Sequence, residues 1–109
     1  MELTEQQMLE TIKDTIDKNK IVVFMKGTPA QPRCGFSATV VDILNRMNAP
    51  YVGVNAIEDP RFRHVLSGHS QWPTLPQVFV DGKLIGGCDI VRERKASGEL
   101  DRVVAEAIR

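Results

Sequence analysis

Apolar residues recur at a helical period near the start of the chain and then give way to an unbroken apolar run. In the first segment they lie three or four residues apart, at Met8, Leu9, Ile12 and Ile16. This spacing predicts an amphipathic helix that begins with the capping box Thr4 and Gln7 and extends to Asn19. Residues 21–25 are all apolar, which is typical of a strand buried on both faces.

A second helix and a second strand follow. The helix is predicted over residues 35–47, after a loop that contains Pro29 and Pro32. Its inner side consists of Val40, Val41, Ile43 and Leu44. Residues 51–55 have the composition of another short strand. Because a helical connection between neighbouring strands makes them parallel, this half of the chain predicts a βαβ unit.

The pattern then changes from parallel to antiparallel pairing. Asp59 and Pro60 are the N-cap and first-position proline of a third helix, which is predicted to run through Leu66 and to stop near Gly68. Further along, Asp81-Gly82 forms the two-residue turn of a hairpin. The apolar runs on either side of this turn are residues 77–80 and 83–85.

The chain closes with a helical region that opens at Cys88-Asp89, breaks near Gly98 and continues from Leu100 to Ile108. Together the elements predict an α/β fold in which helices flank a four-stranded mixed sheet. Since no repeat or linker interrupts the pattern, residues 1–109 are predicted to form a single domain.

The composition narrows the range of functions. With 42% hydrophobic and 26% charged residues, the chain is not of a disordered, fibrous or membrane-spanning type. Fourteen basic residues balance fourteen acidic ones, so neither a nucleic acid nor a membrane is expected as a partner. Two cysteines are too few for a secreted disulfide framework, which favours a reducing compartment. The acidic N-terminus resembles no targeting segment. The expected location is therefore a bacterial cytoplasm, or a mitochondrial or other organelle matrix if a presequence has been removed.

The sequence Cys34-Gly35-Phe36-Ser37 places a lone cysteine at the predicted start of the second helix. In a Cys-x-x-Cys pair, the second thiol resolves the mixed disulfide that the first one forms, and the Ser37 hydroxyl cannot do this. The helix N-terminus and a nearby Lys26 should stabilise the Cys34 thiolate. The residues leave two uses for this thiolate open, namely reaction with an outside thiol and binding of a metal.

Four motifs together resemble those of the monothiol glutaredoxins of the Cys-Gly-Phe-Ser class. They are Lys26-Gly27-Thr28-Pro29 with Pro32, Cys34-Gly35-Phe36-Ser37, Trp72-Pro73-Thr74-Leu75-Pro76-Gln77 and Gly86-Gly87-Cys88-Asp89. The motifs occur in the family's order, and the resemblance covers nearly the whole chain. It implies a thioredoxin-like fold and a single glutaredoxin domain over residues 1–109.

The resemblance also implies a glutathione site. The matching lysine and arginine of the family hold the glycyl carboxylate of glutathione, which gives this role to Lys26 and Arg63. The backbone of Leu75, which precedes a proline expected to have a cis peptide bond, would pair with the cysteinyl part. The first N–H groups of the last helical region, at Cys88 and Asp89, and the Asp89 side chain would receive the γ-glutamyl group.

The role of Cys88 stays open among three alternatives. It could form a disulfide with Cys34, line the glutathione site through its backbone, or simply be buried. The backbone role is favoured here.

The resemblance further implies that two protomers and two glutathione molecules supply four thiolates to one [2Fe-2S] cluster, with Cys34 as the metal ligand of each protomer. Such a cluster-bridged homodimer would act in iron–sulfur cluster assembly and iron homeostasis. Its partners would be apo iron–sulfur proteins and a BolA-like protein. The alternative is a glutathione-dependent thiol-disulfide oxidoreductase that deglutathionylates proteins, with Cys34 as the catalytic nucleophile.

Overall fold

A four-stranded mixed sheet forms the centre of the computed structural model, which describes residues 3–109. The strands, in chain order, are β1 Ile21–Met25, β2 Val52–Asn55, β3 Gln77–Val80 and β4 Lys83–Gly86. The helices are α1 Glu5–Lys18, α2 Gly35–Arg46, α3 Pro60–Ser70, α4 Cys88–Ser97 and α5 Glu99–Ala107. Met1 and Glu2, which begin the acidic N-terminal segment, lie outside the described residues.

Strand β1 lies between β2 and β3 in the sheet order β2-β1-β3-β4. It pairs in parallel with β2, where Val22 is opposite Val52, and antiparallel with β3, where Val22 is opposite Phe79. Strands β3 and β4 form the predicted hairpin, and its turn residues Asp81 and Gly82 both have positive φ angles. The predicted α/β class and mixed sheet are therefore confirmed.

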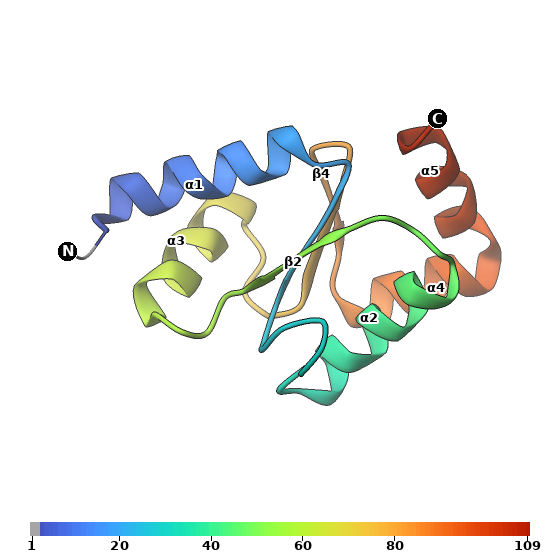
Figure 1. Cartoon of the computed structure of the whole chain (residues 1–109), viewed down its shortest axis with the longest axis horizontal. Coiled ribbons are helices and arrows are strands. Elements are labelled where there is room, and N and C mark those ends of the chain that lie inside the picture. The colour runs from blue at the N-terminus through green and yellow to red at the C-terminus, as the bar shows by residue number, and fades with distance from the viewer. Residues whose placement is uncertain (1–2) are drawn as a thin grey trace.

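Helices cover both faces of this sheet (Figure 1). Val22 and Phe24 of β1 belong to a core with α1 and α3, whereas Ile21, Val23 and Met25 belong to a core with α2, α4 and α5. None of the five side chains is more than 1% exposed. The strand is apolar at every position because each of its two faces meets a helical layer.

The helix ends follow the sequence signals with one exception. Thr4 and Gln7 form the predicted capping box: the Thr4 hydroxyl accepts the Gln7 N–H at 3.1 Å, and the Gln7 side chain accepts the Thr4 N–H at 2.8 Å. The prediction that the third helix stops near Gly68 was wrong, because α3 continues to Ser70 and ends at Gln71, whose φ is 59°. A glycine ends a helix where it adopts the left-handed conformation, and here Gln71 adopts that conformation while Gly68 does not.

The predicted break near Gly98 is confirmed, and it separates α4 from α5. Gly98 has a φ of +84°, a left-handed conformation that ends α4. Two ion pairs connect the helices across this break, Arg94 with Glu99 at 3.4 Å and Lys95 with Asp101 at 2.9 Å.

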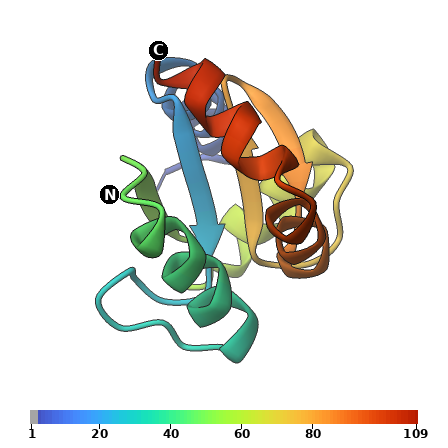
Figure 2. The same cartoon turned by 90° about the vertical axis from the view of Figure 1, so that its right-hand side faces the viewer.

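The C-terminal end of β1 points toward the loop that leads into α2 (Figure 2). This edge of the sheet is where an open α/β fold places its ligands. Among residues 3–109, no helix combines the length and the apolar character needed to cross a bilayer.

Candidate functional site

The Cys34 thiol lies at the N-terminus of α2. Cys34 is the N-cap residue of the helix and has an extended backbone, with φ −154° and ψ 140°. Its side chain is half-buried. The sulfur therefore meets the first N–H groups of the helix while part of it stays open to solvent.

These surroundings lower the pKa of the Cys34 thiol below its ordinary value of 9.0. The backbone N–H of Ser37 has the largest effect, and burial of the sulfur opposes it. The backbone N–H of Phe36, the positive charge of Lys26 and the Ser37 hydroxyl lower the pKa further. The predicted stabilisation of the thiolate thus has a local electrostatic cause.

The loop before Cys34 begins with a turn that requires glycine. Gly27 has a φ of +91°, and a β carbon at this position would overlap the Gln31 carbonyl oxygen and the Arg33 backbone. The Arg33 N–H donates to the Lys26 carbonyl oxygen at 2.8 Å. The chain therefore leaves β1 after Met25 and returns beside Lys26, which brings Cys34 back to the end of the strand.

A cavity of about 290 Å³ lies at this edge of the sheet. All five residues that the sequence assigns to ligand binding line it: Lys26, Arg63, Leu75, Cys88 and Asp89. Further lining comes from residues without a predicted ligand role, namely Phe36, Trp72, Thr74, Pro76, Gly87 and Ile90. Cys34 is not part of this lining, but its neighbours in space, Lys26 and Phe36, are.

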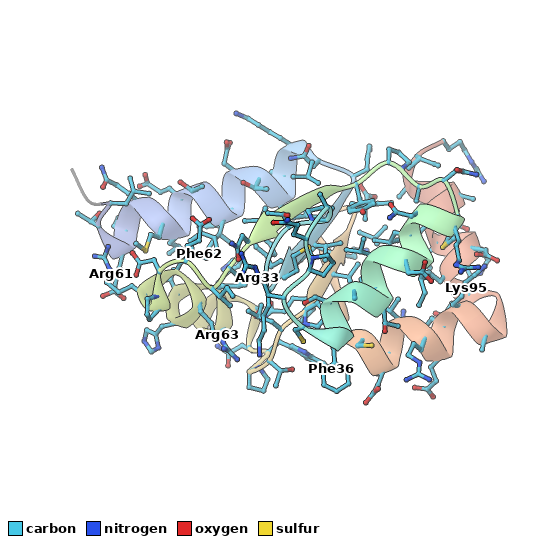
Figure 3. The ribbon with its side chains drawn as sticks, turned by 60° about the horizontal axis from the view of Figure 1, so that its bottom comes forward. Arg33, Phe36, Arg61, Phe62, Arg63 and Lys95 are labelled. Atoms are coloured by element: carbon cyan, nitrogen blue, oxygen red, sulfur yellow. The ribbon has the colours of Figure 1, made fainter. Side chains whose placement is uncertain are left out.

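The charges on the cavity wall suit a small ligand with carboxylate groups. Lys26 directly follows β1 and Arg63 is on α3, and neither forms an ion pair within residues 3–109. Asp89 lies on the same wall in the first turn of α4. Figure 3 shows Arg63 on α3 and Phe36 on α2 along the same edge of the molecule.

The segment before β3 presents its backbone to the cavity. The Leu75–Pro76 peptide bond is cis, as expected. The N–H and C=O of Leu75 have no hydrogen-bond partner among the described residues, although its side chain is only 6% exposed. These two groups are available to pair with an extended ligand.

Trp72 and Gly87 contribute to the cavity in a way that the sequence did not predict. The Trp72 Nε1 atom is buried without a hydrogen-bond partner. A β carbon at position 87 would lie 3.3 Å from this nitrogen. Aromatic residues near a motif most often pack in a core or loop, so the pattern alone carried no signal for this role.

The two cysteines are both free and differ in their surroundings. Cys88 is buried, at 7% exposure, and burial raises the pKa of its thiol above 9.0. The charge of Arg92 opposes this increase, while Asp89 and Cys34 add to it. Of the two thiols, Cys34 therefore ionises at the lower pH, and Cys88 lines the cavity.

Ser37 and Phe36 differ sharply in exposure. The Ser37 side chain is fully buried, and its hydroxyl accepts the backbone N–H of Lys26 at 3.1 Å. Phe36 is 59% exposed beside the cavity. No group of three or more His, Cys, Asp or Glu residues within 3–109 is arranged to hold a metal ion.

Residues 21–85 match the family model of the glutaredoxins. The chain is 43% identical over 106 residues to "Probable monothiol glutaredoxin 2" of Rickettsia prowazekii (strain Madrid E), with 97% of this chain and 99% of the relative covered. It is 46% identical over 92 residues to "Glutaredoxin-related protein 5, mitochondrial" of Danio rerio, which covers 84% of this chain and 59% of that relative.

Two solved structures share the fold. The solution structure of reduced poplar apo GrxS14 is 45% identical, has a TM-score of 0.84 and covers 94% of both chains. The crystal structure of a buckwheat glutaredoxin–glutathione complex is 26% identical, has a TM-score of 0.83, and covers 94% of this chain and 92% of that one.

Proposed function

The chain belongs to the glutaredoxin family, and on that premise we propose that it binds glutathione and carries a [2Fe-2S] cluster between two protomers. The observation that supports this most directly is the position of Cys34. Its thiol has a lowered pKa and is partly open to solvent. Its neighbours Lys26 and Phe36 line a cavity whose two cations, Lys26 and Arg63, form no ion pair among the described residues. The similarity to monothiol glutaredoxins points to the same use.

The cavity suits glutathione in charge and shape. Lys26 and Arg63 would hold the glycyl carboxylate through charge-assisted hydrogen bonds. The free N–H and C=O of Leu75 would pair with the backbone of the cysteinyl residue. The first turn of α4 would receive the γ-glutamyl carboxylate, and Asp89 its ammonium group. This arrangement would bring the glutathione thiol toward Cys34.

One chain alone does not supply enough thiolate ligands for a [2Fe-2S] cluster. A [2Fe-2S] cluster takes four ligands, commonly thiolates. Each chain offers one thiolate of lowered pKa, since Cys88 is buried and its pKa is raised. Two protomers and two glutathione molecules would complete the set. Because two of these ligands are bound non-covalently, the cluster would be labile, which suits transfer to apo-proteins.

The proposed partners follow from this carrier role. They are a second copy of the chain, apo iron–sulfur proteins that receive the cluster, and a BolA-like protein that replaces one protomer. The proposed location is a bacterial cytoplasm or an organelle matrix, in keeping with relatives from Rickettsia and from mitochondria.

Anaerobic reconstitution with iron, sulfide and glutathione tests the proposal. We expect a coloured dimer with the absorption of a [2Fe-2S] centre, and we expect the colour to be lost when glutathione is removed by gel filtration. A colourless monomer under all these conditions would rule out the carrier function.

The lowered pKa of Cys34 also favours a second candidate function, glutathione-dependent reduction of mixed disulfides. The Cys34 thiolate would attack the glutathione sulfur of a glutathionylated protein and release the protein thiolate. A second glutathione thiolate would then attack the sulfur of the bound glutathione, giving glutathione disulfide and regenerating Cys34. Rapid turnover of a glutathionylated peptide by the cluster-free protein would place this function first.

A further inference from the structure

Two side chains hold consecutive backbone N–H groups where β1 ends. The Lys26 N–H donates to the Ser37 hydroxyl at 3.1 Å, and the Gly27 N–H donates to the Asn55 Oδ1 atom, also at 3.1 Å. Ser37 comes from α2 and Asn55 from the end of β2. Three elements that are distant in sequence thus meet at one dipeptide.

The sheet itself cannot satisfy these two donors. The β1–β2 ladder ends at the pair Met25 and Asn55, and the β1–β3 ladder ends at Phe24 and Gln77. Beyond Met25 neither ladder continues, and the isolated bridge between Gly27 and Pro32 is closed by the N–H groups of Thr28 and Arg33 instead. A partly buried N–H group without a partner is unfavourable, so the two side chains replace the missing strand.

Asn55 also joins this dipeptide to the segment that leads into α3. Its Oδ1 atom accepts the Ile57 N–H at 3.3 Å, and its Nδ2 group donates to the Glu58 carboxylate at 3.3 Å. This segment continues into the helix that carries Arg63. The orientation of Asn55 is therefore coupled to the separation between Lys26 and Arg63, the two cations of the cavity wall.

Ser37 performs the corresponding task on the other side. It is in the first turn of α2, three residues after Cys34, and its side chain is fully buried. Its hydroxyl ties this turn to the backbone of Lys26, which lines the cavity. A change in this contact would move Lys26 relative to Cys34.

We infer that Ser37 and Asn55 are positioning residues, which clamp the Lys26–Gly27 backbone and so hold Lys26 in register with Cys34 on one side and with Arg63 on the other. The inference rests on the proposed glutathione site. It gives the serine of the Cys-Gly-Phe-Ser motif a structural task that its hydroxyl performs as a hydrogen-bond acceptor.

The test compares glutathione affinity in three variants by calorimetry. Asn55→Leu removes the acceptor, and Ser37→Ala removes the buried hydroxyl. The double variant Asn55→Asp with Glu58→Gln keeps an acceptor oxygen at position 55 and moves the amide donor of the Asn55–Glu58 contact to position 58. We expect Asn55→Leu and Ser37→Ala to weaken glutathione binding about tenfold, as when a group that orients a binding side chain is lost. The double variant should retain most of the affinity.

Thr39→Val is the matched control. Thr39 is on the same helix as Ser37, and its hydroxyl donates only to the Gly35 carbonyl oxygen, at 2.9 Å. This variant should bind glutathione as the wild type does. Amide hydrogen exchange supplies a readout that needs no ligand: the Lys26 amide should exchange faster in Ser37→Ala, and the Gly27 amide faster in Asn55→Leu.

The outcomes separate this inference from the proposed function. If the wild-type protein binds no glutathione, the proposed site fails and this inference fails with it. If the wild type binds glutathione but Ser37→Ala and Asn55→Leu bind it equally well, the clamp is wrong and the site stands. Unchanged exchange of both amides would also overturn the clamp. Weaker binding with faster exchange in Ser37→Ala and Asn55→Leu, together with retained binding in the double variant, supports it.

Discussion

The indole ring of Trp72 lies against Gly87, where α4 begins. A β carbon at position 87 would come within 3.3 Å of the Trp72 Nε1 atom and within 3.2 Å of the Pro76 carbonyl oxygen. All three residues line the cavity. The absence of a side chain at position 87 therefore lets the cis-proline segment and the N-terminus of α4 approach each other, and this approach shapes the part of the cavity assigned to the γ-glutamyl group.

Substitution of Gly87 by alanine tests this close approach. The added methyl group must displace Trp72 or the Pro76 carbonyl, so we expect weaker glutathione binding and a free energy of unfolding lower by about 1 kcal/mol, the lower end for overpacking. Gly68→Ala is the matched control for binding, because a β carbon there meets nothing within 4 Å; its free energy of unfolding should rise slightly, since alanine has the higher helix propensity. Calorimetry and urea denaturation measure the two effects. Equal behaviour of the two alanine variants would show that the contact has no influence on the cavity.

Trp72 should also report on ligand binding by fluorescence. It is the only tryptophan of the chain and lies on the cavity wall, so a bound ligand changes the polarity around the indole ring. We expect the emission of the reduced protein to change in a saturable way as glutathione is added, with the same dissociation constant as calorimetry gives. A constant emission across a range where calorimetry detects binding would mean that glutathione occupies another surface.

The two thiols should differ in their dependence on pH. The pKa of Cys34 is lowered from 9.0 by the Ser37 N–H first, while burial raises that of Cys88 above 9.0. We expect iodoacetamide to modify Cys34 with a midpoint below pH 9.0 and to spare Cys88 at neutral pH, as measured by peptide mass spectrometry. Lys26→Gln should shift the Cys34 midpoint upward, whereas Lys83→Gln, at the exposed first residue of β4, should leave it in place. Faster modification of Cys88 than of Cys34 would contradict the assignment.

The lowered pKa of Cys34 also makes the free energy of unfolding depend on pH. A thiol whose folded pKa lies below its unfolded value of 9.0 stabilises the folded state as the thiolate. This contribution is complete above pH 9.0 and is lost as the pH falls through the folded pKa. The wild type should therefore gain stability relative to Cys34→Ser between these two values, as chemical denaturation at several pH values would measure. A stability difference that does not change across this range would be the contrary result.

Replacement of each cysteine distinguishes their roles in cluster binding. Cys34→Ser should abolish the colour of the reconstituted dimer, because each protomer would lose its one available thiolate. Cys88→Ser should leave the colour largely intact, since the buried Cys88 thiol is assigned no ligand role. The absorption spectrum after anaerobic reconstitution gives the measurement. A comparable loss of colour in both variants would show that Cys88 has been misassigned.

Several features of the fold were predictable because they depend on neighbouring residues. Three such features are the apolar run at residues 21–25, the capping box at Thr4 and the Asp81-Gly82 turn. Each was predicted from a few consecutive residues, and the structure confirms all three. The end of α3 was not predictable from Gly68. A helix ends where a residue adopts the left-handed conformation, and in this chain Gln71 does so instead of Gly68.

The candidate site was likewise predictable from the sequence only in part. Cys34 was identified by its motif, since a helix start and a missing second cysteine are both visible in consecutive residues. The grouping of Lys26, Arg63 and Asp89 in one cavity was expected from resemblance to a family, not from their spacing. The fold alone decided that Cys88 is buried and that Trp72 lies on the cavity wall.

By itself, then, the sequence determined the order of helices and strands and the presence of a lone thiol at a helix N-terminus. Only the tertiary structure decided that the Ser37 hydroxyl would accept the Lys26 N–H, and that Asn55 would accept the N–H of Gly27, 28 positions away. Hydrophobic period and capping are properties of adjacent residues. The partner of a polar side chain depends instead on which strands are neighbours in the sheet and where their ladders end.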